Sequence, residues 1–166
     1  MNGAIRQATR ADVPALIRLI TALAEFENLP PPDAAARQRL EEDGFGARPR
    51  FEAWLAFWPG VADPVAYAFL FETYSTFLAR PTLYLEDLFV LPEFRGRGLG
   101  SALLRHCIRL AHQRGCGRME WAVLDWNVKA QKVYDDLGAR RLSEWFLYRL
   151  TQEQIARLAR DRGETG

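Results

Sequence analysis

The hydrophobic residues of this chain repeat with two spacings, one typical of helices and one typical of strands. From Val13 to about Glu27 they return every three or four positions, as they do on the buried face of a helix. The same spacing runs from Gly98 to Arg114 and stops at Gly115, a residue type that often ends helices. The pattern predicts three further helices: residues 33–42, residues 128–137 and a terminal helix capped by Thr151.

Strands are predicted where aromatic and β-branched residues cluster between turn residues. They span residues 5–8, 51–58, 65–74, 82–90 and 119–124, followed by two strand-like pieces at 140–142 and 144–150. Short turns between the early strands favour antiparallel pairing. The helix of residues 98–114 makes the connection to the strand 119–124 a crossover, which requires parallel pairing. The expected fold is therefore mixed α/β, with a mainly antiparallel central sheet, one parallel strand pair and helices on both faces.

Length and charge balance narrow the class of protein. At 166 residues and without a linker, the chain fits a single domain, residues 1–166. Lys and Arg number 22 against 21 Asp and Glu, so no net field attracts nucleic acid or an anionic membrane. The N-terminus lacks the apolar run of a signal peptide, and no stretch approaches the roughly 18 apolar residues of a membrane span. We expect a cytoplasmic protein with neither nucleic acid nor a membrane as partner.

The cysteines and histidines do not predict a metal site. Cys107 and Cys116 form no disulfide framework, and they lack the recurring pairs of a structural zinc site. His106 and His112 are not three or four residues apart, the spacing that puts two ligands on one helix face. The expected role of both cysteines is packing, because free cysteine is among the most buried residue types.

A glycine-rich loop carries the strongest chemical signal in the sequence. It joins the strand 82–90 to the helix 98–114 and reads Leu-Pro-Glu-Phe-Arg-Gly-Arg-Gly-Leu-Gly-Ser over residues 91–101. Glycines let main chain approach a ligand, and the helix start offers unpaired N–H groups and a partial positive charge. A tight turn would explain a lone glycine pair. Arg95 and Arg97 favour an anionic ligand, because neighbouring guanidinium groups repel each other unless they face an anion or solvent.

The spacing of the glycines distinguishes between phosphate-binding motifs. The Gly-Lys-Ser/Thr ending of a Walker loop is absent. The dinucleotide fingerprint Gly-x-Gly-x-x-Gly fails at its last position, because Gly96 and Gly98 are followed by Ser101 where the third glycine would stand. A nucleotide cofactor is therefore disfavoured.

The pattern Arg95-x-x-Gly98-x-Gly100 after an apolar strand resembles the acetyl-CoA-binding motif of the GNAT acetyltransferase family. The order of the predicted elements resembles that fold, and Asn127 followed by Tyr134 matches the family's second cofactor-side motif. Three segments look like the diamine (spermidine/spermine) acetyltransferase branch: residues 40–46, residues 84–90 and Trp126-Asn127. The resemblance implies parallel strands that splay apart at the acetyl-CoA site. It also implies acetyl transfer from acetyl-CoA to a primary amine, which is a polyamine, a diamine or an amino-acid side-chain amine.

The resemblance implies that acetyl-CoA, the co-substrate, contacts the strand end, the loop with its helix start, and the helix after Asn127. The residues are Leu88, Phe89, Val90, Arg95, Gly96, Arg97, Gly98, Leu99, Gly100, Ser101, Asn127, Ala130 and Tyr134. Spacing supports the second part, because Asn127 and Tyr134 are about two helical turns apart and so share one side of a helix. The alternative is that Asn127 only caps its helix while Tyr134 packs.

Two residues are candidates for the chemistry of transfer. By resemblance Tyr134 is the general acid that protonates the departing thiolate. Glu86 is the expected base, acting directly or through water; alternatively it is a solvated or ion-paired strand carboxylate. Strict alternation would place Tyr84, Glu86 and Leu88 on one face of a strand that leads directly into the loop.

The resemblance also indicates an amine site, formed by Phe26, Glu27, Glu86, Asp87 and Trp121. Carboxylates there would attract an extended cation. The chain departs from the branch at two places: the branch usually carries tyrosine where this chain has Phe26, and residues 142–146 are shorter and differently charged. These departures count against polyamines as the specific substrate.

The C-terminal segment predicts a homodimer. Trp145, Phe146, Leu147 and Tyr148 follow one another with weak alternation, which leaves apolar surface to cover. Dimers are also usual among the proteins that the chain resembles. Two other functions remain as alternatives to the enzyme: a catalytically silent acetyl-CoA-binding regulator, and a nucleotide-binding or purely interacting domain.

Overall fold

The computed structural model describes residues 4–160, which form two compact units that meet in sequence between Trp126 and Asn127. The first unit holds the sheet and three helices, whose bounds are β1 Ile5–Gln7, α1 Val13–Phe26, α2 Ala34–Phe45, β2 Glu52–Phe57, β3 Pro64–Ser75, β4 Arg80–Val90, α3 Leu99–Gln113 and β5 Arg118–Trp121. Short 3-10 turns precede α1 at Arg10–Asp12 and follow β4 at Pro92–Phe94. The second unit contains α4, Val128–Asp136, and α5, Gln152–Arg160. The single-domain interpretation stays a prediction.

The sheet has the predicted mixed topology. Its five strands lie in the order β1-β2-β3-β4-β5, with antiparallel pairing from β1 to β4 and parallel pairing between β4 and β5. The parallel pair exists because α3 returns the chain to the same end of the sheet before β5 begins. The expected α/β fold with a mainly antiparallel sheet is thereby confirmed.

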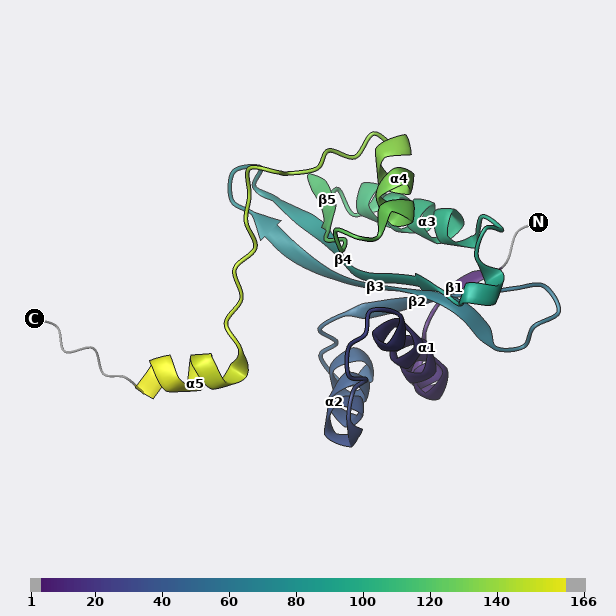
Figure 1. The fold of residues 1–166 in the computed structure, drawn as a ribbon, viewed down its shortest axis with the longest axis horizontal. Helices are drawn as coiled ribbons and strands as arrows, with labels where there is room; N and C mark the ends of the chain where they lie inside the picture. The colour runs from purple at the N-terminus through teal and green to yellow at the C-terminus, as the bar shows by residue number, and fades with distance from the viewer. Residues whose placement is uncertain (1–3, 161–166) are drawn as a thin grey trace, which may run out of the picture. The chain divides into compact units, whose positions relative to one another are not determined.

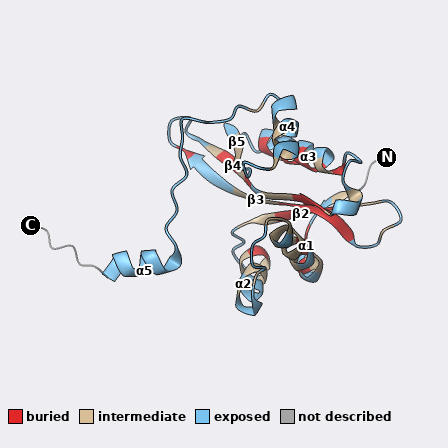
Figure 2. Ribbon diagram, viewed as in Figure 1, coloured by how far each residue is buried: buried red, intermediate tan, exposed pale blue. Residues whose placement is uncertain are grey.

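Helices cover both faces of this sheet. Figure 1 shows α1 and α2 on one side of the strands and α3 on the other. Burial is greatest along β2, β3 and β4 and on the sheet-facing side of α3 (Figure 2). Leu16 and Leu19 of α1 pack with Leu55, Tyr67 and Phe89 of the sheet in one core cluster. Truncation of such a leucine to alanine costs about 2–5 kcal/mol, so this cluster fixes α1 on the sheet.

Cys107 on α3 is buried and its thiol has a raised pKa, as expected of a cysteine whose role is packing. Cys107 lies on α3 beside Leu103 and Leu104, and all three side chains are buried. Burial raises the pKa of the Cys107 thiol to about 12. The packing role predicted for Cys107 is confirmed, while Cys116 is only half-buried. Among residues 4–160 no group of three or more His, Cys, Asp or Glu side chains is arranged to hold a metal ion.

A β-bulge interrupts the pairing of β3 with β4 next to the glycine loop. Phe69 pairs with Asp87 and Leu70 pairs with Leu85, so Glu86 is the extra residue on β4. A bulge changes which way the following side chains point. The Tyr84 ring packs against the ring of Phe71, which lies on the same face of β3 as Phe69, whereas Leu88 lies beside α3. The prediction that Tyr84, Glu86 and Leu88 share one face is therefore wrong, since strict alternation does not hold across the bulge.

The C-terminal strand prediction is also wrong. Residues 140–150 form no strand in the described part of the chain, and Trp145, Phe146, Leu147 and Tyr148 are exposed. These residues have high strand propensity, but a strand forms only where a neighbouring strand takes up its backbone N–H and C=O groups. No helix within residues 4–160 has the length and hydropathy needed to cross a membrane.

Candidate active site

The glycine loop has a backbone that requires glycine at two positions. Gly96 and Gly98 have φ angles of +73° and +82°, in the left-handed region that other residues adopt at a cost. A Cβ atom at either position would meet nothing within 4 Å. Conformation rather than crowding therefore requires these glycines, and the space beside them is open.

The start of α3 is available to bind an anion. Gly98 is the N-cap, no side chain caps the helix, and its first turn contains no acidic residue. The first N–H groups of a helix have no partner within the helix and carry partial positive charge. Gly100 lies close against the end of β4, where a Cβ atom would be 3.4 Å from Val90 Cγ2. The sequence around Gly98 thus builds a helix start suited to phosphate.

The pairing of the two strands beside the loop ends before β4 does, and the predicted splaying stays a prediction. The parallel pairing covers Thr82–Leu85 of β4 and Arg118–Trp121 of β5, and it stops there. β4 continues to Val90 with β3 on its other side. Leu88, Phe89 and Val90 therefore lie beyond the end of β5, at the point where the chain enters the loop.

Both loop arginines lie over aromatic rings. The Arg95 guanidinium carbon is 4.4 Å from the ring centroid of Phe26 and 5.2 Å from that of Phe89. Arg95 Nε also donates a hydrogen bond to the Val90 carbonyl at 2.9 Å. The Arg97 guanidinium lies 5.0 Å from the Trp58 ring and 5.6 Å from the Phe94 ring. Cation–π contacts thus hold both side chains against the protein.

Three carboxylates act on one another near the β4 bulge. Asp87 is largely buried, and burial is the main cause that raises its pKa to about 6. Tyr67 donates a hydrogen bond from its hydroxyl to Asp87 Oδ2 at 2.9 Å, which lowers that pKa in part. The negative charges of Glu86 and Glu27 raise it further, so the structure brings α1 and β4 carboxylates into one electrostatic cluster. A cation would relieve their mutual repulsion.

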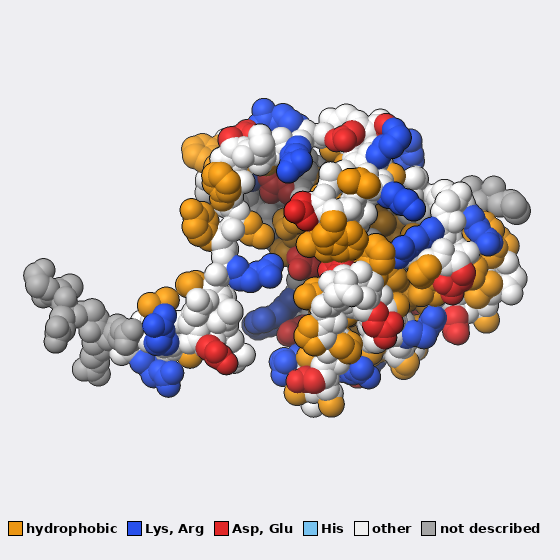
Figure 3. Space-filling model, in the orientation of Figure 1, with side chains coloured by type: hydrophobic (Ala, Val, Ile, Leu, Met, Phe, Trp, Pro, Cys, Tyr) orange, Lys and Arg blue, Asp and Glu red, His pale blue; other side chains and the backbone are white. Residues whose placement is uncertain are grey.

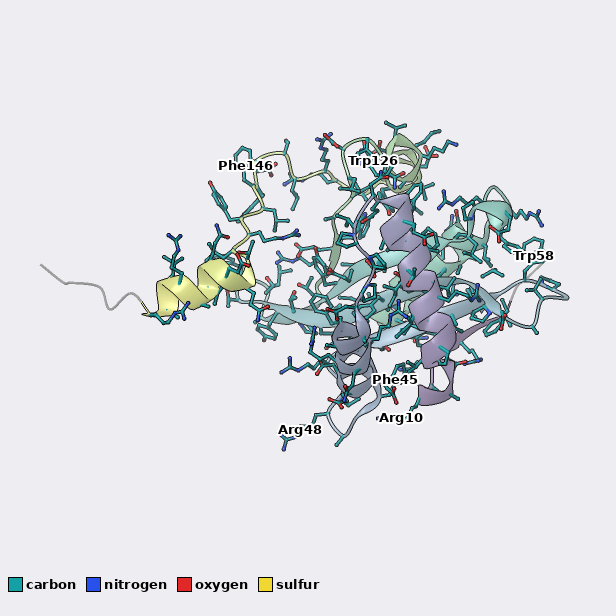
Figure 4. The ribbon with its side chains drawn as sticks, turned by 60° about the horizontal axis from the view of Figure 1, so that its bottom comes forward. Arg10, Phe45, Arg48, Trp58, Trp126 and Phe146 are labelled. Carbon is teal, nitrogen blue, oxygen red and sulfur yellow. The ribbon has the colours of Figure 1, made fainter. Side chains whose placement is uncertain are left out.

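An aromatic cluster adjoins these carboxylates. The Phe26 ring lies 5.4 Å from the Trp126 ring, edge to face, and 6.3 Å from the Phe89 ring. Figure 4 shows Trp126 beside the C-terminal end of α1, where Phe26 precedes Glu27. Phe89 in turn lies 6.5 Å from Tyr67. Rings beside carboxylates suit an amine on an apolar stem.

The structure therefore groups four of the five predicted amine-site residues: Phe26, Glu27, Glu86 and Asp87. Trp121 is the last residue of β5, and its backbone pairs with Leu85 one residue before Glu86. On the face shown in Figure 3, acidic and basic side chains are interspersed and form no patch of a single sign.

The residues predicted on the second cofactor-side motif lie on α4, in the unit of residues 127–166. Asn127 is the N-cap, and its Oδ1 accepts a hydrogen bond from the Ala130 N–H at 3.3 Å. Asn127 therefore caps α4, as the alternative interpretation of this residue expected. Tyr134 is half-buried, and burial raises the pKa of its phenol. A phenol with a raised pKa keeps its proton at neutral pH, the form that can donate to a leaving group.

Sequence reasoning did not predict that Tyr67 and Trp126 contact residues of the candidate amine site. Tyr67 lies in a strand of small and apolar residues, and its side chain is fully buried. A buried tyrosine hydroxyl needs a hydrogen-bond partner, which was the available signal. The partner, Asp87, comes from the neighbouring strand, so the pair depends on the register.

The first unit thus combines an uncapped helix start, a β4 end that extends beyond β5, and a cluster of carboxylates and aromatic rings. The chain belongs to the acetyltransferase (GNAT) family, whose profile matches residues 17–139. It is accordingly an acyltransferase of the acetyltransferase class, and the family uses acetyl-CoA.

Curated relatives cover nearly the whole chain. A thialysine N-epsilon-acetyltransferase from Sus scrofa is 38% identical, over 93% of this chain and 96% of that protein. An L-ornithine N5-acetyltransferase from Arabidopsis thaliana is 31% identical, over 93% of this chain and 87% of that protein. A spermidine/spermine N(1)-acetyltransferase-like protein from Homo sapiens is 31% identical, over 93% of this chain and 23% of that protein. The predicted likeness to the diamine acetyltransferase branch is confirmed.

The fold likewise matches a solved structure. The crystal structure of a probable acetyltransferase superposes with a TM-score of 0.78 and 26% sequence identity, over 89% of this chain and 97% of that chain. This likeness supports the assignment of the fold.

Proposed function

We propose that this protein transfers the acetyl group of acetyl-CoA to a primary amine. The observation that carries the proposal is the start of α3, where two positive-φ glycines leave open space before helix N–H groups that no side chain caps. That geometry suits the pyrophosphate of the coenzyme. The adjoining end of β4, Leu88 to Val90, lies beyond the pairing with β5 and would take the pantetheine arm.

The carboxylate cluster is the proposed amine site. Asp87 and Glu27 would bind the cationic part of the substrate, and the Phe26 and Phe89 rings would line its apolar stem. Trp121 completes this set. Among the classes of amine considered, the side-chain amine of an amino acid is favoured, because the relatives named for thialysine and L-ornithine align over nearly all of this chain.

Two residues would carry the proton transfers. Acetyl-CoA supplies an activated thioester carbonyl. Glu86, exposed on the bulge, would take a proton from the ammonium group directly or through water, so that neutral nitrogen attacks the carbonyl carbon. Tyr134 would give its proton to the departing sulfur as the carbon–sulfur bond breaks, and the second proton lost from the acetylated nitrogen would pass to the Tyr134 phenolate and restore the phenol. A backbone N–H of Leu88 or Val90 would polarise the carbonyl oxygen.

The setting of the enzyme belongs to the same proposal. Exposed apolar side chains at residues 145–148 support a homodimer. Cys107 and Cys116 are both free thiols, which supports a reducing, cytoplasmic compartment.

Ligand-dependent melting tests the coenzyme. Acetyl-CoA is expected to raise the melting temperature, whereas equal concentrations of NAD and ATP leave it nearly unchanged, because only a bound ligand stabilises the folded state. Equal stabilisation by ATP would contradict the assignment.

A panel of amines then tests the substrate. Initial rates would be compared across diamines, polyamines, thialysine-like amino acids and peptide N-termini. The amino acids with a side-chain amine are expected to give the highest kcat/KM. Coenzyme binding without turnover of any amine would favour the silent regulator.

A further inference from the structure

Arg95 and Arg97 flank the same glycine, yet they pack on different parts of the fold. Arg97 lies over Trp58, from the β2–β3 turn, and over Phe94 of its own loop. Arg95 instead reaches Phe26 at the end of α1 and Phe89 within β4. The two side chains therefore leave the loop toward different neighbours.

The Arg95 side chain is held by three contacts. Its guanidinium lies 4.4 Å from the Phe26 ring centroid and 5.2 Å from the Phe89 ring centroid. Its Nε donates to the Val90 carbonyl at 2.9 Å, which fixes the plane of the group. Burial at this position lowers the pKa of Arg95. With these contacts, the Arg95 guanidinium is directed toward the sheet and α1.

Each of the two rings under Arg95 is connected to a carboxylate of the proposed amine site, one through the chain and the other through side-chain contacts. Phe26 is followed by Glu27 at the end of α1. Phe89 lies 6.5 Å from Tyr67, and the Tyr67 hydroxyl donates to Asp87 at 2.9 Å. Arg95 thus contacts both Phe26, which precedes Glu27, and Phe89, which packs near the tyrosine that binds Asp87.

We infer that Arg95 is a positioning residue for the amine site, through its stack on Phe26 and Phe89, in addition to its place in the coenzyme loop. The inference rests on the proposed function. A planar guanidinium can stack on a ring and donate from Nε at the same time, whereas a lysine ammonium offers no such plane. Arg95 thereby sets the coenzyme loop and the amine site in one arrangement.

The test separates the two substrates kinetically. Arg95→Met is expected to raise the KM for the amine about tenfold and the Kd for acetyl-CoA less than about threefold, since the lost contacts are with the rings. Arg95→Lys should behave like Arg95→Met. The matched variant Arg97→Met should raise the Kd for acetyl-CoA and leave the amine KM near its original value.

Two kinetic results would overturn the inference. If Arg95→Met weakened acetyl-CoA binding strongly and left the amine KM unchanged, the guanidinium would be a phosphate ligand. If Arg95→Lys restored the original amine KM, positive charge alone would be sufficient.

A measurement on unfolding distinguishes this inference from the proposed function. In a double-mutant cycle of Arg95→Met with Phe26→Leu, the drop in melting temperature of the double variant is expected to be clearly smaller than the sum of the two single drops. The control cycle of Arg97→Met with Phe26→Leu should be additive. An additive Arg95 cycle would refute the stack even if the enzyme is active. A non-additive cycle in a protein that acetylates no amine would refute the proposed function and the positioning role, but not the stack.

Discussion

Asp87 combines a cost in stability with a proposed role in binding the amine. It is largely buried, next to the charges of Glu86 and Glu27, and its pKa is raised from 3.8 to about 6. The folded state therefore holds its proton more tightly than the unfolded state does. The linked stability is fully present below about pH 4 and is lost as pH rises through about 6. At neutral pH the fold carries a charge that an amine ligand would neutralise.

Asparagine at this position should therefore stabilise the protein and impair it. Asp87→Asn is expected to raise the free energy of unfolding at pH 8 by up to about 2–3 kcal/mol, because each unit of the pKa shift is worth about 1.4 kcal/mol. The gain should shrink between pH 6 and 4 and vanish below that range. Urea unfolding at pH 8, 5 and 4 measures it. A gain that does not depend on pH would refute the electrostatic cause.

The phenol of Tyr134 gives a second prediction for a single residue. Tyr134→Phe is expected to lower kcat by about 10²-fold or more, the usual effect of losing a positioned general acid, with little change in the Kd for acetyl-CoA. Tyr74→Phe, at an exposed site on β3, is the matched control and should be silent. Single-turnover rates provide the measurement. Near-normal turnover of Tyr134→Phe under conditions where chemistry limits the rate would remove Tyr134 from the acid role.

At this scale the sequence predicted residue types better than their surroundings. Phe26, Glu27, Glu86 and Asp87 were expected to form an amine site. The charges of Glu27 and Glu86 act on Asp87, and Phe26 is linked to Asp87 through Phe89 and Tyr67, while the site itself stays a prediction. The partner of Asp87 was not expected, because Tyr67 and Asp87 meet only through the register of β3 with β4. The bulge at Glu86 was missed for the same reason, since alternation along one strand contains no information on its neighbour.

Among the elements, α3 begins at a glycine whose φ angle is matched by a glycine in a turn elsewhere in the chain. Gly98 and Gly60 have φ angles of +82° and +81°, and a Cβ atom at either would meet nothing within 4 Å. Alanine at either position should therefore cost about the same, roughly 1–2 kcal/mol of stability, through backbone strain alone. The two glycines differ in that only Gly98 begins a helix at the proposed coenzyme site.

This pair makes a controlled test of the loop. Gly98→Ala should reduce the rise in melting temperature that acetyl-CoA produces, and Gly98→Glu should abolish it by charge repulsion at the helix start. Gly60→Ala should lower the melting temperature without ligand and keep the full response to acetyl-CoA. An undiminished response in Gly98→Glu would refute the assignment of the loop. The φ angle also shows that Gly98→Glu carries a folding cost of its own.

The helices and strands were predicted wherever hydrophobic residues recur with a regular spacing. The helices with one apolar face and the strands from β1 to β5 were expected within a few residues of their bounds, because hydrophobic spacing reports which face is buried. Residues 140–150 show the limit. Their side chains favour a strand, but strand formation depends on a partner that no local pattern encodes.

For the whole molecule, the exposed segment of residues 145–148 leads to a prediction about assembly. The chain is expected to be a homodimer at micromolar concentration, because four consecutive large apolar side chains are more exposed surface than single chains usually keep. Phe146→Ser with Tyr148→Ser should shift the mass to that of a monomer and leave the sheet of β1–β5 folded. Sedimentation velocity and circular dichroism measure both. A monomeric mass for the unmodified chain would refute the dimer.

The bulge has a consequence for how this strand tolerates a change in length. Leu85 and Asp87 lie on opposite faces of β4, as neighbours in an unbroken strand do, and only Glu86 stands between them. Deletion of Glu86 should therefore close β4 into regular pairing while every other side chain keeps its face. A deletion inside a central strand normally moves the side chains on one side of the deleted residue to the opposite face of the sheet. Here it would remove one carboxylate and one kink, so the sheet should tolerate the loss of Glu86 even though the proposed base would be gone.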